Sequence, residues 1–215
     1  SIWRLRNPIS KIFLKITFER LLFISTREER SFKNIKDVIN QNHLKKVKIL
    51  PDLSFYTLKN ILGRFPNLSA KLSNKMRVGL TLMPWLEFGS STLEKYIDSL
   101  VYLITHLIKE FDAEFFVIPQ VTYPAEKFDP VFLEIINRLS PAYSKKVHLL
   151  NKEMKIEELL KIYSQLNILV ATRMHSAIFS LSAGTPVLAI AYDVGAKWGI
   201  LEVIGAKSVS YTHLT

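Results

Sequence analysis

The sequence predicts an α/β protein made of two doubly wound domains, and three observations support this fold class. From Arg77 onward, short runs of apolar and β-branched residues alternate with segments of helical periodicity. These runs are apolar throughout, as in strands of a parallel sheet that helices cover on both faces. A shorter series of the same kind precedes residue 51, and a polar segment separates the two series. We therefore expect two Rossmann-like domains that face each other across a cleft.

The second domain is expected to alternate strictly between strand and helix. Its strands are expected at 77–82, 114–119, 146–150, 167–172 and 187–192. Its helices are expected at 90–111, 129–139, 155–166 and 175–183. The helix at 90–111 has the clearest pattern, because apolar residues recur from Leu93 to Ile108 at spacings of three and four.

The first domain is expected to contain helices at 10–20 and 29–40 and strands at 21–26 and 47–50. The segment 51–75 is rich in Pro, Asn, Ser and Lys, with only a weak apolar pattern from Leu58 to Ile61, which is typical of a linker. The expected domains follow from these patterns. Residues 1–55 are expected to form the C-terminal part of an incomplete first domain, and residues 56–75 the linker. Residues 76–207 are expected to form the second domain, and residues 208–215 a non-native tail.

From the sequence at its two ends, we expect the chain to be a fragment of a longer protein. The chain starts with Ser1, and no signal peptide follows it. The last seven residues, "VSYTHLT", resemble a translated transposon-adapter sequence. The alternative for this segment is a short edge strand.

Composition excludes several classes of function. The 215 residues include no cysteine, so disulfides, thiol catalysis and thiolate metal sites are excluded. Lys11, Lys15, Glu19 and Arg20 interrupt the apolar stretch at 9–24, which is therefore too polar to cross a membrane. The net charge is +10, and residues 1–50 hold 12 Lys and Arg against 4 Asp and Glu. This basic half could face anionic ligands or a membrane surface, or it could be an ordinary lysine-rich surface.

Arg173, Met174 and His175 interrupt the apolar pattern between an expected strand and an expected helix. Parallel sheets bind ligands beyond the carboxyl ends of their strands, and helix N-termini attract anions. Arg173 can pair a carboxylate or phosphate through two hydrogen bonds, and His175 can transfer a proton near neutral pH. The residues thus predict a small anionic substrate with proton transfer. The structural alternative is an Arg173 ion pair and a His175 that only caps its helix.

At this point the sequence resembles a known family. The stretch "ATRMHSAIFSLSAGTPVLAIAYD" (171–193) resembles the polysaccharide pyruvyl transferases, which have Arg-Leu-His or Arg-Met-His here, then Gly-Thr-Pro-Val and a strand ending in Tyr-Asp or Tyr-Glu. Segments 23–35, 49–55 and 79–85 resemble the family's Ser-x-Arg-Asp-x-x-Ser, Pro-Asp and Pro-Trp segments. The resemblance covers nearly the whole chain up to about Lys207.

The resemblance implies a GT-B-like fold and a bacterial enzyme of exopolysaccharide or cell-wall polysaccharide synthesis. The family transfers a pyruvyl group from phosphoenolpyruvate to two hydroxyls of a sugar, which forms a cyclic ketal. By this resemblance Arg173, the backbone of Met174, and His175 hold phosphoenolpyruvate, Arg27 reaches it from the first domain, and His175 transfers a proton. No cofactor or metal is implied, since phosphoenolpyruvate is the donor substrate. The implied acceptor is a glycan or lipid-linked saccharide, and the implied location is the cytoplasm, at the inner membrane surface.

The chain departs from the family pattern at two places. Met83 stands where members often have an arginine before Pro-Trp. Lys197 follows Tyr192 at a longer distance than the family's lysine, so it is either a substrate-binding residue or a solvated loop lysine.

Two rival functions stay open from the residues alone. One is a nucleotide-sugar glycosyltransferase of the same architecture. The other is a non-catalytic anion-binding module, although a nucleic-acid partner is not expected because the basic residues are mostly scattered lysines. No pattern in the sequence indicates an oligomeric state.

Overall fold

The computed structural model describes residues 7–63, 75–83, 90–119, 129–150 and 154–190. The predicted tail at 208–215 lies outside these ranges. The described residues up to Tyr56 belong to one compact unit and those from Thr57 onward to another. In the described part of the chain, no helix is both long and apolar enough to span a bilayer.

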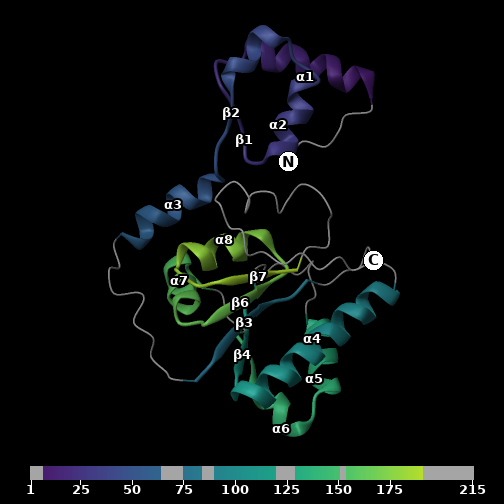
Figure 1. The fold of residues 1–215 in the computed structure, drawn as a ribbon, viewed down its shortest axis with the longest axis vertical. Helices are drawn as coiled ribbons and strands as arrows, with labels where there is room; N and C mark the ends of the chain where they lie inside the picture. The colour runs from purple at the N-terminus through teal and green to yellow at the C-terminus, as the bar shows by residue number, and fades with distance from the viewer. Residues whose placement is uncertain (1–6, 64–74, 84–89, 120–128, 151–153, 191–215) are drawn as a thin grey trace. The chain divides into compact units, whose positions relative to one another are not determined.

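The second unit is built on a five-stranded parallel sheet (Figure 1). The strands lie in the spatial order β5-β4-β3-β6-β7. Their bounds are β3 Arg77–Thr81, β4 Glu114–Val117, β5 Val147–Leu149, β6 Ile168–Ala171 and β7 Val187–Ala189. All five predicted strands are confirmed, each shorter than expected because strand pairing covers only part of each apolar run.

Helices cover both faces of this sheet (Figure 1). Figure 1 shows α4 (Ser90–Phe111), α5 (Asp129–Arg138) and α6 (Pro141–Ser144) on one face, and α7 (Ile156–Ser164) and α8 (Met174–Ser182) on the other. No helix was expected between the helix at 129–139 and the strand at 146–150, so α6 was not predicted. Ser140 caps this short helix, because its hydroxyl accepts a hydrogen bond from the Tyr143 N–H.

The main core lies between the sheet and the α4–α5 layer. Odd and even residues of a strand face opposite sides, so Val78 and Leu80 of β3 point into this core. They pack with one apolar face of α4, namely Tyr96, Ile97, Leu100 and Ile104. This packing fixes α4 against the strand that leads to the candidate site.

The first unit contains two parallel strands, β1 (Ile24–Thr26) and β2 (Val47–Ile49). Its helices are α1 Pro8–Arg20, α2 Glu29–Lys36 and the 3₁₀ helix η1 Gln41–Lys46, and α3 Leu53–Leu62 begins in this unit and extends past its last described residue, Tyr56. A small core forms around Ile24, Ile35, Ile39 and Val47. The fold therefore continues the strand–helix alternation that the sequence predicted.

Two element boundaries expected in this unit are wrong. β1 begins at Ile24 rather than residue 21, because its partner strand begins only at Val47 and Leu22 is 94% exposed. α2 ends at Lys36 rather than at 40, because the Val38 N–H bonds to the Ile35 carbonyl and tightens the last turn. The expected linker at 56–75 begins inside α3, whose Leu58 is buried. The predicted domain boundaries themselves stay predictions.

Candidate functional site

Arg173, Met174 and His175 follow β6 directly, at a distinctive place in the sheet. From β3 the chain continues to β4 and β5, which lie on one side of β3. It then crosses to β6 and β7, which lie on the other side. The strand order therefore changes direction between β3 and β6. Ligands of doubly wound sheets bind at this switch point, beyond the carboxyl ends of the strands.

The three residues point in different directions because they start a helix. Arg173 is extended, with φ −118° and ψ 131°, and serves as the N-cap of α8 without a side-chain capping bond. The Arg173 side chain is half-buried, the Met174 side chain is buried and His175 is exposed. Met174 can therefore reach a ligand through its backbone only, whereas Arg173 and His175 can use their side chains. The first turn of α8 adds the partial positive charge of a helix N-terminus.

A buried hydroxyl network holds this strand end in position. The Thr81 hydroxyl accepts a hydrogen bond from the Thr172 N–H at 3.2 Å and lies 3.1 Å from the Ser176 hydroxyl. The Thr172 hydroxyl donates to the Thr81 carbonyl, and the Ser176 hydroxyl donates to the Arg173 carbonyl at 2.6 Å. These bonds join the end of β3 to the end of β6 and to the first turn of α8.

Tyr96 of α4 also reaches the end of β6, although its sequence position did not predict this. It occupies an apolar position of the helix and is 1% exposed. Its hydroxyl is buried near Thr172, the backbone of Met83 and the Arg173 charge, and this burial raises the pKa of Tyr96 despite those neighbours. Its helical spacing identified it only as a core residue. A hydroxyl among otherwise apolar helix positions was the one available sign of a different role.

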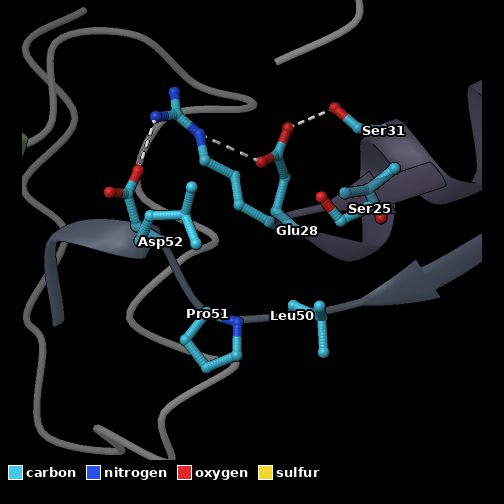
Figure 2. Close-up of a pocket in the computed structure, with 9 residues that line it drawn as sticks. Ser25, Glu28, Ser31, Leu50, Pro51 and Asp52 are labelled. Atoms are coloured by element: carbon cyan, nitrogen blue, oxygen red, sulfur yellow. Dashed lines mark hydrogen bonds and ion pairs between the residues drawn. The ribbon is translucent and has the colours of Figure 1, made fainter. Parts of the chain in front are cut away.

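A second group of polar residues lies in the first unit, around Arg27. The carboxyl ends of β1 and β2 and the starts of α2 and α3 enclose a pocket of about 370 Å³. The Leu50 N–H bonds to the Thr26 carbonyl at 2.8 Å and brings the two strand ends together. Figure 2 shows Leu50 and Pro51 along one border of the pocket and Asp52, Glu28 and Ser31 along the other.

Two carboxylates accompany Arg27 in this pocket. The Arg27 Nη1 donates to Asp52 Oδ2 at 3.1 Å, and the Arg27 Nε lies 3.5 Å from Glu28 Oε2. The Ser31 hydroxyl donates to the other oxygen of Glu28 (Figure 2). Neither acid was predicted as a site residue, although each lies just after a predicted strand, where charged loop residues indicate a site.

The charge state of Asp52 depends on opposing effects. Partial burial alone would raise the pKa of Asp52, but hydrogen bonds from the Ser54 side chain and backbone, and then Arg27, outweigh it. The pKa of Asp52 is therefore held below its ordinary value. Asp52 stays ionised beside Arg27 at neutral pH.

The structure places the predicted site residues as follows. Arg173, Met174 and His175 lie together in the second unit, and Arg27 lies in the pocket of the first unit. Lys197 lies outside the described residues. The assignment of these residues to substrate binding stays a prediction.

The sequence as a whole identifies the family. The family model described as polysaccharide pyruvyl transferase matches residues 1–194. The chain belongs to the polysaccharide pyruvyl transferase family. This membership agrees with the resemblance found in the sequence. Among curated proteins, no significant match was found.

Solved structures define the fold class of this pyruvyl transferase family member. UDP-GlcNAc 2-epimerase from Methanocaldococcus jannaschii aligns with a TM-score of 0.58 at 11% identity, over 93% of this chain and 54% of the epimerase. A UDP-forming α,α-trehalose-phosphate synthase from Burkholderia xenovorans aligns with a TM-score of 0.61 at 10% identity, over 96% of this chain and 53% of the synthase. The chain thus has a GT-B-like fold of Rossmann-type units, and it spans about half the length of these structures.

Proposed function

We propose that the protein transfers a pyruvyl group from phosphoenolpyruvate to two hydroxyls of a sugar, in a polysaccharide or its lipid-linked precursor. The products are a cyclic pyruvate ketal and phosphate. One observation carries the proposal: in a member of this family, Arg173, Met174 and His175 lie at the switch point of the sheet and at the start of α8. Polarity, position and family point to the same anionic donor.

The donor would be held mainly by the second unit. A guanidinium binds a carboxylate or phosphate through two parallel hydrogen bonds, and Arg173 is partly exposed beside the helix start. Backbone N–H groups in the first turn of α8 add further donors for the anion. The hydroxyl network of Thr81, Thr172 and Ser176 would keep this arrangement rigid before the donor binds.

The chemistry requires one proton to reach the donor and two to leave the acceptor. A proton added to the methylene carbon of phosphoenolpyruvate makes the adjacent carbon electrophilic, and the first sugar hydroxyl bonds to that carbon as its O–H bond breaks and its proton is released. The bond to phosphate then breaks, and the second hydroxyl closes the ketal as its proton leaves with the phosphate. His175 is the candidate for proton transfer, either to the methylene or from the first hydroxyl, because its imidazole is exposed at the helix start.

Arg27 is the predicted donor contact from the first unit, and Lys197 is a further predicted contact. The guanidinium of Arg27 forms ion pairs with the carboxylates of Asp52 and Glu28. We therefore propose that Arg173 supplies most of the attraction for phosphoenolpyruvate.

The test measures phosphate release from phosphoenolpyruvate by the intact protein, with and without glycan acceptors. We expect release that saturates with donor and depends on the acceptor. Arg173→Lys should raise the KM for phosphoenolpyruvate at least about tenfold, because a lysine cannot make the two-pronged contact. Arg138→Lys is the matched control, since Arg138 pairs with Glu94, Asp98 and Glu134 on α4 and α5. Absence of saturable phosphoenolpyruvate binding would refute the proposed function.

A further inference from the structure

A chain of hydrogen bonds through two buried hydroxyls ends on the backbone carbonyl of Arg173. The hydroxyls belong to Thr81, at the end of β3, and Ser176, in the first turn of α8. We propose that Thr81 and Ser176 are positioning residues, which aim the Met174 N–H at the anionic donor by holding the Arg173 carbonyl. Their effect on catalysis rests on the proposed function, whereas the orientation of this N–H group does not.

The donors and acceptors of this chain fix its direction. The Ser176 hydroxyl donates its only proton to the Arg173 carbonyl, at 2.6 Å. It can therefore only accept in its contact of 3.1 Å with the Thr81 hydroxyl. The Thr81 hydroxyl in turn accepts a hydrogen bond from the Thr172 N–H at 3.2 Å, so its own proton is available for Ser176. The bonds thus run from the Thr172 N–H through Thr81 and Ser176 to Arg173.

Burial makes each of these bonds difficult to replace. Thr81 and Thr172 are each 1% exposed, and Ser176 is 0% exposed. Hydrogen bonds in such surroundings are stronger than in water, and bonds in a chain polarise one another. Because each hydroxyl accepts one bond and donates one, removal of either hydroxyl leaves buried polar groups without their partners. The chain therefore favours a single orientation of the Arg173 carbonyl.

The orientation of this carbonyl also determines that of the Met174 N–H. The two groups belong to one planar trans peptide unit and point in opposite directions. The carbonyl points into the helix, where it accepts from the Ser176 hydroxyl and from the Ala177 N–H at 3.2 Å. The Met174 N–H is the first of α8, and such groups have no partner within their own helix. It therefore points outward from the helix start, where anions bind.

Ser164 distinguishes this role from ordinary stabilisation of a helix. The Ser164 hydroxyl also donates to the carbonyl three residues earlier, that of Lys161, at 2.8 Å. Ser164 is 5% exposed and is the last residue of α7, whereas Ser176 begins α8 and continues the chain to β3. Ser164→Ala therefore removes a buried bond of the same kind at the end of a different helix.

The experiment measures kcat and the KM for phosphoenolpyruvate of the intact protein, and separately titrates the isotope-labelled protein with inorganic phosphate. Ser176→Ala and Thr81→Val should each raise the KM about five- to tenfold, as expected for one misaligned hydrogen bond, and change kcat by less than about twofold. Phosphate should shift the Met174 amide signal of the native protein, with a Kd that rises by a similar factor in both variants. Thr81→Ser keeps the hydroxyl and should retain the native constants, and so should the control Ser164→Ala.

A double variant tests whether the two hydroxyls act as one chain. If Thr81 acts through Ser176, Thr81→Val should raise the KM by less than about twofold in a Ser176→Ala background. Factors that multiply in the double variant would show that Thr81 does not act through Ser176, which refutes the proposed chain.

The results separate this proposal from the proposed function. If phosphoenolpyruvate is turned over but its KM is unchanged in Ser176→Ala and Thr81→Val, or rises equally in Ser164→Ala, the positioning role falls and the proposed function stands. If phosphoenolpyruvate does not react, but phosphate shifts the Met174 amide and both variants weaken that binding, the positioning role stands and the proposed function falls. A Met174 signal that does not respond to phosphate would refute the proposed orientation of its N–H.

Discussion

At the scale of single residues, the start of α8 combines one core residue with two residues whose side chains can contact a ligand. Met174 is buried and anchors the helix, whereas its neighbours Arg173 and His175 keep side chains that solvent can reach. A strand that ends where a helix begins makes this possible, because consecutive side chains leave the backbone in different directions. An arginine and a histidine can thus flank a buried methionine at the edge of a hydrophobic core.

His175 is the residue for which we expect the largest catalytic effect. His175→Ala should lower kcat by about 10²- to 10⁴-fold, the range typical for loss of a general acid or base. The Kd for phosphoenolpyruvate should change only a few-fold, because Arg173 and the backbone still hold the donor. Steady-state kinetics and direct binding measurements distinguish the two effects.

His148→Ala provides the control, since His148 is an exposed histidine on β5 of the same unit. Equal turnover in both variants would leave His175 without a chemical role.

Asp52 should make the stability of the protein depend on acid pH. Its pKa is lower in the folded protein than the ordinary value of 3.8, so the carboxylate stabilises the fold above that value. This contribution is lost as the pH falls through the folded pKa. Between pH 6 and pH 3, the free energy of unfolding should therefore fall by up to about 1 kcal/mol more in the native protein than in Asp52→Asn.

Urea denaturation at the two pH values measures this difference, with Asp37→Asn as the exposed control. Equal losses in the native protein and Asp52→Asn would show that the contacts of Asp52 with Arg27 and Ser54 do not stabilise the fold.

At the scale of elements, β3 packs against residues on both faces of the sheet. Val78 and Leu80 pack toward α4, whereas Gly79 and Thr81 face the opposite side of the sheet. Thr81 is the residue that bonds to Thr172 and lies against Ser176, so the end of this strand positions the start of α8. A shift of β3 would thus move the candidate donor site directly.

Gly79 is needed where β3 meets the layer of α7. A Cβ at this position would lie 2.5 Å from Leu166 Cδ1 and 2.7 Å from Leu169 Cδ1. Both leucines are buried, so Gly79→Ala should reduce the free energy of unfolding by about 1–3 kcal/mol through overpacking. Urea denaturation measures this effect.

Gly63→Ala is the control, because a Cβ there meets no atom closer than 3.5 Å. It should change stability by no more than about 0.5 kcal/mol. Similar values for the two variants would show that the leucines move aside at little cost.

At the scale of the whole molecule, each unit brings its own polar groups to the carboxyl ends of its strands. The second unit places Arg173 and His175 there, and the first unit places Arg27, Glu28 and Asp52 there.

Sequence periodicity by itself determined the elements of the fold. Every predicted strand is present, because runs of apolar β-branched residues are local properties of the chain. The polar triplet at 173–175 was also identified from the sequence, since it interrupts such a run. The ends of β1 and α2, and the helix α3 in the expected linker, were not predicted, because pairing partners and burial determine them.

The tertiary structure alone decided which distant residues meet. The order β5-β4-β3-β6-β7 places Thr81 beside Thr172, 91 residues later, and so joins the end of β3 to the start of α8. Packing of α4 brings the Tyr96 hydroxyl to the same place. Pairing of β1 with β2 brings Asp52 to Arg27, so that the predicted donor contact carries acidic partners. No local propensity encodes these contacts, because each depends on how separate elements pack.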